Sequence, residues 1–319
     1  MTLLYSDPRF LEHATGDHPE NPTRLAHILR HLDATGLADR CQRPAFGPVS
    51  PERLTRVHDS GYVADVAEFI ARGGRLLEAD TVVGPKSYDA ALLAAGAVTD
   101  AVERVVRGED TTALCLVRPP GHHARPNAAM GFCLFDNVAI GARLAIDELQ
   151  LDRVLIVDWD VHHGNGTQEI FWRDAAVGFF SVHRWPFYPG SGASDETGSG
   201  PGLGTTLNLP LAFGTPRDDY IERFTGEVTR MADRLRPQLI LLSAGFDSHR
   251  ADPIGSLGLE TEDFATLTAA VRDVAQAHAG GRIVSVLEGG YNPAVLAECV
   301  GLHLEGLTSP EIQNPKSRI

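Results

Sequence analysis

The chain has 319 residues, and its 28 Lys and Arg residues against 42 Asp and Glu residues leave a formal charge of −14. This balance argues against a dedicated nucleic-acid binder, because neutralising phosphates requires clustered Lys and Arg. The longest apolar runs, such as 154–157 and 239–242, are far too short to cross a bilayer, so no membrane association is expected. The four cysteines show no paired spacing, and Asp7 and Pro8 come before any signal-peptide core could form, so we expect a reducing, cytoplasmic location.

Helical and strand-like patterns alternate along the chain. In chain order they predict a helix at 88–107, strands at 112–117, 153–157, 177–182 and 207–209, a helix at 218–235, a strand at 238–243, a helix at 262–278 and a strand at 282–287. Strands joined through helices need crossover connections, so the predicted fold class is α/β, with a central, mostly parallel sheet flanked by helices on both faces. No charge block or linker divides the chain, which predicts a single domain over 1–319, with about the last ten residues as a tail.

Residues 189–206 form a glycine-rich segment that contains six glycines and no regular pattern. A phosphate-cradling loop is the functional alternative, but no helical pattern follows the segment and no Lys occupies a P-loop position. We therefore expect a loop at the surface or at the rim of an active site.

Ionisable residues directly follow four of the predicted strands, in the segments 118–123, 158–166, 245–247 and 288–292. Ligands of open parallel sheets bind outside the carboxyl ends of the strands, so these segments are expected to converge on one pocket. Five of the 13 histidines fall between positions 122 and 183, which strengthens the indication of chemistry in this region.

The Asp-x-Asp-x-His pattern at 158–162 is the strongest local motif. In an extended segment Asp160 and His162 point to the same side, and Asp158 shares their alternation. A set of carboxylates and imidazole suits a divalent metal, and Asp247 at another strand end is the natural third ligand of a site with open positions. Strand-end capping is the alternative, but so many ionisable groups in a β-rich run are costly to bury without a metal or partners.

Two further features allow either a structural or a catalytic role. His122 and His123 are adjacent, and such a pair is either solvated or hydrogen-bonded to carbonyl groups or, near a metal, suited to proton transfer close to neutral pH. Tyr291 follows two glycines and is either a tyrosine packed at the rim or an O–H donor to a developing oxyanion.

Taken together, these segments resemble the zinc-dependent histone deacetylase and acetylpolyamine amidohydrolase family, and in particular its class II-like bacterial branch. The matching segments, in the family's order, are 18–24 (His-Pro-Glu-Asn-Pro-Thr-Arg), 118–124, 130–133, 158–166, 181–183, 243–247 and 288–292. The resemblance implies the arginase/deacetylase fold. It also implies a zinc-dependent hydrolase that removes acetyl groups from acetyl-lysine in proteins or from acetylpolyamines and releases acetate.

The resemblance also assigns roles to individual residues. The implied zinc ligands are Asp160, His162 and Asp247. The implied catalytic residues are His123 as general base and acid, His122 as its electrostatic neighbour, Asp158 as the carboxylate that orients His122, Asn165 as the partner of His123, and Tyr291 as the catalytic tyrosine. The implied substrate contacts are Phe132, Tyr188, Gly131, Ile254 and Asp80, and Arg24 resembles the arginine near the acetate exit channel. One implied potassium site comprises Asp158, Asp160, His162, Ser181 and Val182, and a second includes Phe171, Asp174 and Val177.

Two alternative functions share some of these sequence features. An arginase-like ureohydrolase of the same fold uses two manganese ions and needs further carboxylates where this chain has 163–165 (His-Gly-Asn). A non-catalytic acyl-lysine binding or scaffold protein would not need intact ligands, the histidine pair and Tyr291 together. The substrate stays open among acetyl-lysine, acetylpolyamines and other small amides, and Ile254 stands where polyamine-selective vertebrate members carry Glu. Whether the chain forms a homo-oligomer also stays open.

Overall fold

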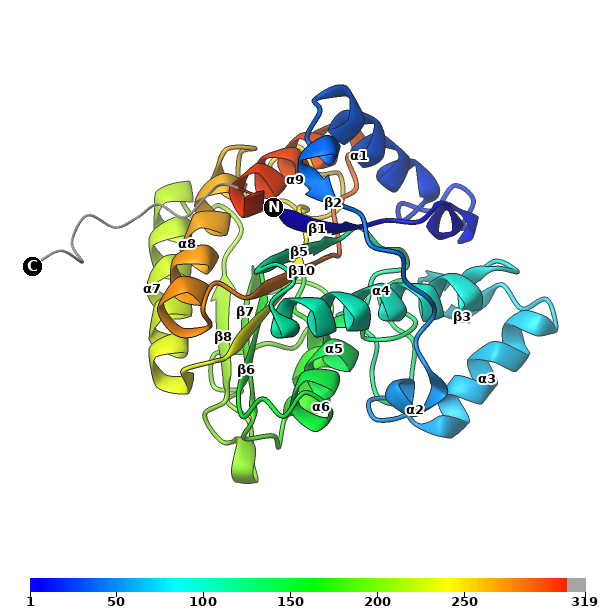
Figure 1. Ribbon diagram of the computed structural model, residues 1–319, viewed down its shortest axis with the longest axis horizontal. Coiled ribbons are helices and arrows are strands. Elements are labelled where there is room, and N and C mark those ends of the chain that lie inside the picture. The colour runs from blue at the N-terminus through cyan, green and yellow to red at the C-terminus, as the bar shows by residue number, and fades with distance from the viewer. Residues whose placement is uncertain (309–319) are drawn as a thin grey trace, which may run out of the picture.

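Eight parallel strands form the centre of the molecule, and helices cover both faces of the sheet (Figure 1). The computed structural model describes residues 1–308. Across the sheet the strands follow the order β2-β1-β5-β10-β9-β6-β7-β8, and all neighbours in this order are parallel. The strands of this sheet are β1 (Thr2–Tyr5), β2 (Cys41–Gln42), β5 (Thr112–Cys115), β6 (Val154–Asp158), β7 (Val177–Arg184), β8 (Thr206–Leu211), β9 (Leu239–Ala244) and β10 (Ile283–Leu287). A separate antiparallel hairpin consists of β3 (Leu76–Glu78) and β4 (Thr81–Val82).

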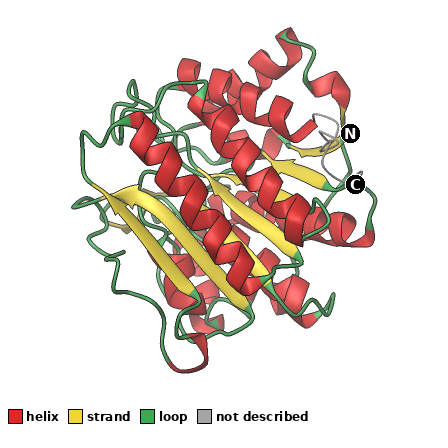
Figure 2. Ribbon diagram, turned by 90° about the vertical axis from the view of Figure 1, so that its left-hand side faces the viewer, coloured by secondary structure: helices red, strands yellow, loops and turns green. Residues whose placement is uncertain are grey.

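The helices form one layer on each side of the sheet, and Figure 2 shows long helices lying across the strands of one face. One layer comprises α1 (Pro22–Ala34), α7 (Arg217–Leu235), α8 (Asp263–His278) and α9 (Pro293–Thr308). The other comprises α4 (Ser87–Arg107), α5 (Asn137–Asp147) and α6 (Asn165–Phe171), with α2 (Pro51–Leu54) and α3 (Ser60–Ala71) packed beside α5 and α4. Short 3₁₀ helices are η1 (Pro8–Glu12), η2 (Ala38–Arg40) and η3 (Gly200–Gly202).

The two helical layers explain why the central strands are buried along their whole length. Every residue of β6, β9 and β10 is buried, which is the pattern of a parallel sheet covered on both faces. The predicted α/β class with a central parallel sheet is therefore confirmed. Among residues 1–308, no helix combines the length and the apolar character needed to cross a membrane.

The predicted elements are all present, with ends that differ by a few residues. Strand β5 ends at Cys115 rather than 117, and β7 continues to Arg184 rather than 182. The sequence patterns did not predict β1, β2 or the β3–β4 hairpin, because runs of two to four residues are too short to show a period. The predicted tail falls on 309–319, outside the described residues.

Candidate active site

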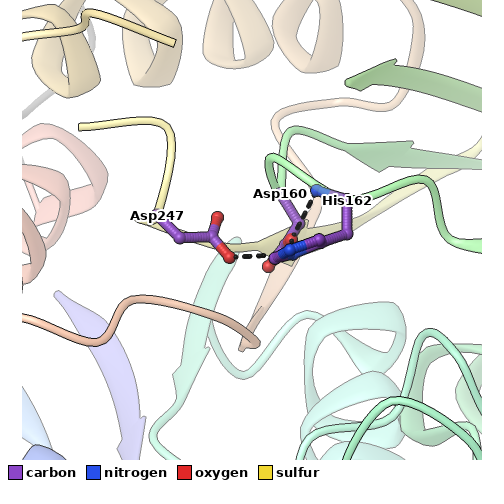
Figure 3. Close-up of side chains that lie close together, drawn as sticks. All are labelled: Asp160, His162 and Asp247. Carbon is purple, nitrogen blue, oxygen red and sulfur yellow. Dashed lines mark hydrogen bonds and ion pairs between the residues drawn. The ribbon is translucent and has the colours of Figure 1, made fainter. Parts of the chain in front are cut away.

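The side chains of Asp160, His162 and Asp247 meet at the carboxyl edge of the sheet (Figure 3). Asp160 and His162 follow β6, and Asp247 follows β9, which is the neighbour of β6 in the sheet. The Nδ1 atom of His162 lies 3.0 Å from Asp160 Oδ1 and 3.2 Å from Asp247 Oδ2. All three residues are buried, and one ligand atom from each lies within 4.8 Å of the others. The structure thus brings the three predicted metal ligands together.

The surroundings of this cluster fit a metal cation. Asp247 Oδ2 is buried and makes no hydrogen bond, which is costly for a carboxylate oxygen unless a positive charge faces it. The other oxygens are anchored, since the Gly289 N–H donates to Asp160 Oδ2 at 2.8 Å and the Val161 N–H donates to Asp247 Oδ1 at 2.9 Å. A Cβ atom on Gly289 would lie 2.2 Å from Asp247 Oδ2, so glycine keeps this space open. Hydrogen bonds of this kind hold ligand carboxylates in the orientation that metal binding requires, and Asp247 Oδ2 is left available for the metal.

The pKa shifts within the cluster also indicate that a cation is favoured there. Burial and the nearby charge of Asp160 raise the pKa of Asp247. Burial disfavours the charged form of His162, but the hydrogen bond with Asp160 and the nearby charges of both carboxylates outweigh it and raise the pKa of this imidazole. The raised pKa values of His162 and Asp247 mean that the cluster without a metal favours bound protons, which a metal cation would replace.

His122 and His123 lie beside this cluster in two different hydrogen-bonding environments. Their ring centres are 4.0 Å apart, and the His123 ring lies 5.9 Å from the ring of His162. His122 Nδ1 is 3.0 Å from Asp158 Oδ2, whereas His123 Nδ1 is 2.7 Å from Asn165 Oδ1. One imidazole therefore faces a carboxylate and the other a neutral amide, as the sequence predicted for both pairs.

These partners give the two histidines opposite protonation. Burial disfavours charge on His122, but the charges of Asp158 and Asp160 outweigh it and hold the pKa of His122 well above its ordinary value. Burial and the neighbouring imidazoles, His122 first, hold the pKa of His123 well below its ordinary value. At neutral pH, His122 is a cation and His123 is a neutral group that can accept a proton.

Glu288 anchors the turn that carries the histidine pair. This fully buried carboxylate accepts hydrogen bonds from the Gly121 N–H at 2.7 Å and from the His122 N–H at 3.3 Å. The contact links residues 167 positions apart, so no local sequence pattern predicts it. It follows from the pairing of β10 with β5, which places the ends of these strands side by side.

Tyr291 is held from its backbone and from its ring. Its N–H donates to Asp252 Oδ2 at 2.6 Å, and the Arg24 guanidinium lies 5.0 Å from the centre of its ring. The Phe132 ring meets it edge-on at 5.8 Å. Burial raises the pKa of Tyr291 well above its ordinary value, so the phenol keeps its proton and remains a hydrogen-bond donor. Asp252 is not among the residues predicted from the sequence, where its only signal is the turn-forming Asp-Pro pair at 252–253.

Arg24 belongs to a fully buried charge cluster behind Tyr291. Asn21 caps α1 and Pro22 occupies its first turn, which sets the direction in which Arg24 leaves the helix. The Arg24 guanidinium donates to the carbonyl oxygens of Gly290 at 2.5 Å and of Glu288 at 2.6 Å. It shares Glu20 with a second buried arginine, which is Arg118.

Replacing Glu20 by Gln should reduce the free energy of unfolding by about 3–5 kcal/mol, because it leaves two buried guanidinium groups without a counter-charge. Both arginines are at most 1% exposed. The matched control is Glu169→Gln, whose partner Arg125 is largely exposed, so that this variant should lose less than about 1 kcal/mol. Denaturant unfolding measures both. Equal losses would contradict the proposed importance of the buried cluster.

Aromatic side chains enclose the approach to the cluster. The Tyr188 ring lies 5.3 Å from the ring of His123 and 6.0 Å from that of His162, edge-on to both. Phe132 reaches the site from the other side through its contact with Tyr291. Phe187 stacks on His162 with ring centres 5.3 Å apart, a contact that the sequence did not indicate. The two predicted aromatic walls are thus next to the predicted ligands and the histidine pair.

The remaining predicted substrate contacts surround these walls. Asp80 Oδ1 accepts a hydrogen bond from the Gly131 N–H at 3.2 Å, which places both residues beside Phe132. The Ile254 N–H donates to Asp252 Oδ1 at 2.9 Å, and Asp252 in turn binds the backbone of Tyr291. The structure therefore brings Asp80, Gly131 and Ile254 close to the site through their neighbours, while their contact with a substrate stays a prediction.

The two predicted potassium sets lie at opposite edges of the sheet. Asp158 and Ser181 are paired in register near the carboxyl end of β6, next to the metal cluster. The second set lies at the amino end of β7 and consists of Phe171, Asp174 and Val177. There the carboxylate of Asp174 pairs with Arg143. Binding of potassium at either edge stays a prediction.

The glycine-rich segment 189–206 begins at the aromatic wall formed by Tyr188. Pro189 and Ser191 line a surface cavity of about 640 Å³ together with Asn165, the partner of His123. This location agrees with the expectation of a loop at the rim of the site.

The structure thus places a buried Asp-His-Asp cluster that could hold a metal ion, with a histidine pair beside it, at the carboxyl edge of a parallel α/β sheet. The family described as histone deacetylase domain matches residues 18–307. The chain belongs to the histone deacetylase family.

Individual relatives agree with this assignment. The chain is 40% identical over 287 residues to the histone deacetylase-like amidohydrolase of Pseudomonas aeruginosa, covering 90% of this chain and 76% of that protein. It is 41% identical over 329 residues to the human polyamine deacetylase HDAC10, covering 98% of this chain and 47% of that protein. Among solved structures, the crystal structure of the HDA15 HD domain matches with a TM-score of 0.91 and 36% identity, covering 96% of this chain and 90% of that one.

Proposed function

We propose that this chain is a zinc-dependent deacetylase that hydrolyses the amide bond of a small acetylated amine or of acetyl-lysine. The observation that carries the proposal is the buried trio of Asp160, His162 and Asp247 beside His123, whose ring lies 5.9 Å from that of His162. Three oxygen and nitrogen donors that leave coordination positions open are typical of catalytic zinc. The names of the relatives, an amidohydrolase and a polyamine deacetylase, support the same reaction class.

The chain's own residues supply the proton transfers. When bound, zinc acts as a Lewis acid that polarises the amide carbonyl and lowers the pKa of water. His123 takes a proton from a water molecule as the oxygen of that water forms a bond to the acyl carbon. Tyr291 donates a hydrogen bond from its O–H to the carbonyl oxygen as that oxygen gains negative charge. His123 then gives the proton to the nitrogen as the C–N bond breaks. The products are acetate and a free amine.

His122 and Asp158 act on this step through His123. The Asp158 carboxylate keeps His122 protonated, and this fixed cation lies 4.0 Å from the His123 ring. The positive charge makes the protonated form of His123 a stronger acid, which favours return of the proton to the departing amine. Asn165 orients His123 without adding a negative charge that would oppose this effect.

Zinc removal and return should change stability as well as activity. Zinc binds ligands that come together only in the folded chain. A free zinc concentration 100 times the Kd should therefore raise the free energy of unfolding by about 2.7 kcal/mol. Calorimetry or denaturant unfolding with and without zinc measures the shift. The control variant Asp247→Asn removes one anionic ligand and should lose most of it. An equal shift in both proteins would place zinc elsewhere.

Metal analysis separates the proposal from the arginase-like alternative. Within residues 1–308 only one group of His, Cys, Asp and Glu residues has metal-binding geometry, and it has three members. Full activity should therefore coincide with one zinc per chain. Two manganese ions per active chain would favour the ureohydrolase alternative and contradict this proposal.

The substrate is tested by comparing kcat/KM for an acetyl-lysine peptide with kcat/KM for acetylated putrescine or spermidine. The net charge of −14 attracts cations at long range, so we expect turnover of cationic amines to fall with added salt more steeply than turnover of a neutral acetyl-lysine amide. Release of acetate from neither class would contradict the proposed function.

A further inference from the structure

The turn that presents Phe132 has a backbone conformation that its own sequence does not favour. Gly131 and Phe132 have φ values of +55° and +71°, and they are the central residues of a tight turn closed by hydrogen bonds between Met130 and Cys133. Glycine or asparagine is normal where φ is positive, and an aromatic residue there is strained. Such strain persists only where the surroundings hold the residue in place.

There is no room for a side chain at Gly131, because the turn packs against His123. A Cβ atom on Gly131 would lie 2.3 Å from Cδ2 of His123, so the turn packs directly on the proposed base. The position of the Gly131–Phe132 turn and that of His123 are therefore linked.

Two consecutive residues at the β3–β4 hairpin hold this turn from outside. The Gly131 N–H donates to Asp80 Oδ1 and the Phe132 N–H donates to Thr81 Oγ1, each at 3.2 Å. The Thr81 hydroxyl in turn donates to Asp80 Oδ1 at 3.0 Å, and Thr81 is fully buried. The two N–H groups of the turn thus donate to side chains and not to a neighbouring strand, so they depend on Asp80 and Thr81.

The same hairpin also contacts the aromatic groups on either side of the turn. His18 Nε2 lies 3.1 Å from the carbonyl oxygen of Asp80, and the His18 ring meets Phe132 edge-on at 4.4 Å. On the opposite wall, burial and then the nearby Asp80 carboxylate, also through a hydrogen bond, raise the pKa of Tyr188. Asp80 therefore holds the turn of one wall through a hydrogen bond and lies near Tyr188 of the other.

We propose that Asp80 and Thr81 are positioning residues that clamp the Gly131–Phe132 turn and thereby set the width of the approach to the metal cluster, through which the acyl group of a substrate must pass. The inference rests on the proposed deacetylase function for its kinetic readout. Within the chain, the Oδ1 atom of the Asp80 carboxylate accepts hydrogen bonds from two donors, so this atom serves to hold the turn.

Thr81→Val and Thr81→Ser test the clamp as a matched pair. Val keeps the size of the side chain and loses the hydroxyl, whereas Ser keeps the hydroxyl and loses the methyl group. The readout is the ratio of kcat/KM for an acetyl-lysine amide to kcat/KM for the butyryl-lysine amide, which does not depend on the fraction of folded enzyme. Val should lower this ratio by about tenfold, the effect of leaving one buried donor without a partner, and Ser should keep it within a factor of about two.

A purely structural role of Thr81 predicts the opposite order. Val would then resemble the original enzyme, Ser would be impaired through its lost methyl packing, and the acyl ratio would change in neither. That result would overturn the proposal. Thr99→Val, which removes a buried hydroxyl bonded only to its own helix, serves as the control and should leave the ratio unchanged.

The Asp80→Asn variant removes the charge of Asp80 but keeps its hydrogen-bond acceptor, so it distinguishes the clamp from a charged contact with the substrate. Asn keeps an oxygen that accepts from the Gly131 N–H, so the clamp predicts an unchanged acyl ratio, as for a retained hydrogen bond. An acyl ratio that falls as far as in Thr81→Val would contradict the proposal, because it would show that the acceptor oxygen of residue 80 is not what holds the turn. A KM at least tenfold higher with the acyl ratio unchanged would support the clamp and assign a substrate contact to the charge of Asp80 in addition.

Hydrogen exchange tests the clamp without any turnover. Amide protection of the peptide that contains 130–133 should fall in Thr81→Val and persist in Thr81→Ser. If the original enzyme released no acetate, the proposed function would fail while this measurement would still support or contradict the clamp. Unchanged protection in Thr81→Val would overturn it.

Discussion

Replacement of His123 by alanine is expected to abolish most turnover and to leave the metal in place. The His123 imidazole is the neutral group beside the cluster, and its Nδ1 atom is bonded to the Asn165 amide rather than to a carboxylate of the trio. Removing a group that accepts and then returns a proton costs about 10²–10⁴ in rate. The expected kcat loss is at the upper end of this range, because one residue performs both transfers.

The measurement combines kcat for an acetyl-lysine amide with zinc content per chain. His278→Ala is a suitable control, since this histidine ends α8, pairs with the exposed Asp233 of α7, and its loss should leave full activity. Loss of zinc from His123→Ala would show that this residue is a ligand rather than a base. Undiminished turnover would remove it from the mechanism.

Replacement of Tyr291 by phenylalanine should lower kcat by about 10²–10³, which is the effect of losing one donor to a developing oxyanion. The ring remains, so its contacts with Arg24 and Phe132 and the backbone bond to Asp252 should persist. We therefore expect KM to change much less than kcat, because the lost hydrogen bond strengthens only as charge develops on the carbonyl oxygen.

Steady-state kinetics on the same acetyl-lysine amide test this prediction. Tyr62→Phe removes another part-buried phenol, one that donates to the Leu134 carbonyl, and should retain kcat. A rate for Tyr291→Phe equal to that of the original enzyme would mean that the phenol does not serve the oxyanion. A raised KM at constant kcat would assign it to substrate binding instead.

The metal trio could be predicted from the sequence because its physical cause is local. Asp160 and His162 follow one buried strand, Asp247 follows another, and the carboxyl ends of parallel strands share one edge of the sheet. The two histidine partners were also predicted, but only through the family resemblance, since nothing in the spacing joins His122 to Asp158 or His123 to Asn165.

The supporting contacts could not be predicted, because each joins residues that are far apart in the chain. Glu288 meets the turn before His122 across 167 positions, and Asp252 meets the backbone of Tyr291 across 39 positions. Thr81 lies in a strand of only two residues, too short for any pattern to reveal. These contacts arise from the strand order and the loops that it brings together, so they become visible only in the folded chain.

Asp80 has partners that the sequence does not reveal. The resemblance assigns it to the substrate, which stays a prediction, and the structure places it beside the turn that carries Phe132. Its Oδ1 atom accepts from the Gly131 N–H and from the hydroxyl of Thr81. No pattern in the sequence joins residue 80 to residue 131, so this contact could not be predicted.

The proposed deacetylase activity depends on zinc held by the buried trio. It is tested by acetate release from an acetyl-lysine amide, using chain stripped of metal with a chelator and then titrated with zinc. We expect no turnover by the stripped chain, recovery that saturates at one zinc per chain, and no recovery in Asp247→Asn. Full acetate release by the metal-free chain, or equal recovery in Asp247→Asn, would contradict the proposed function.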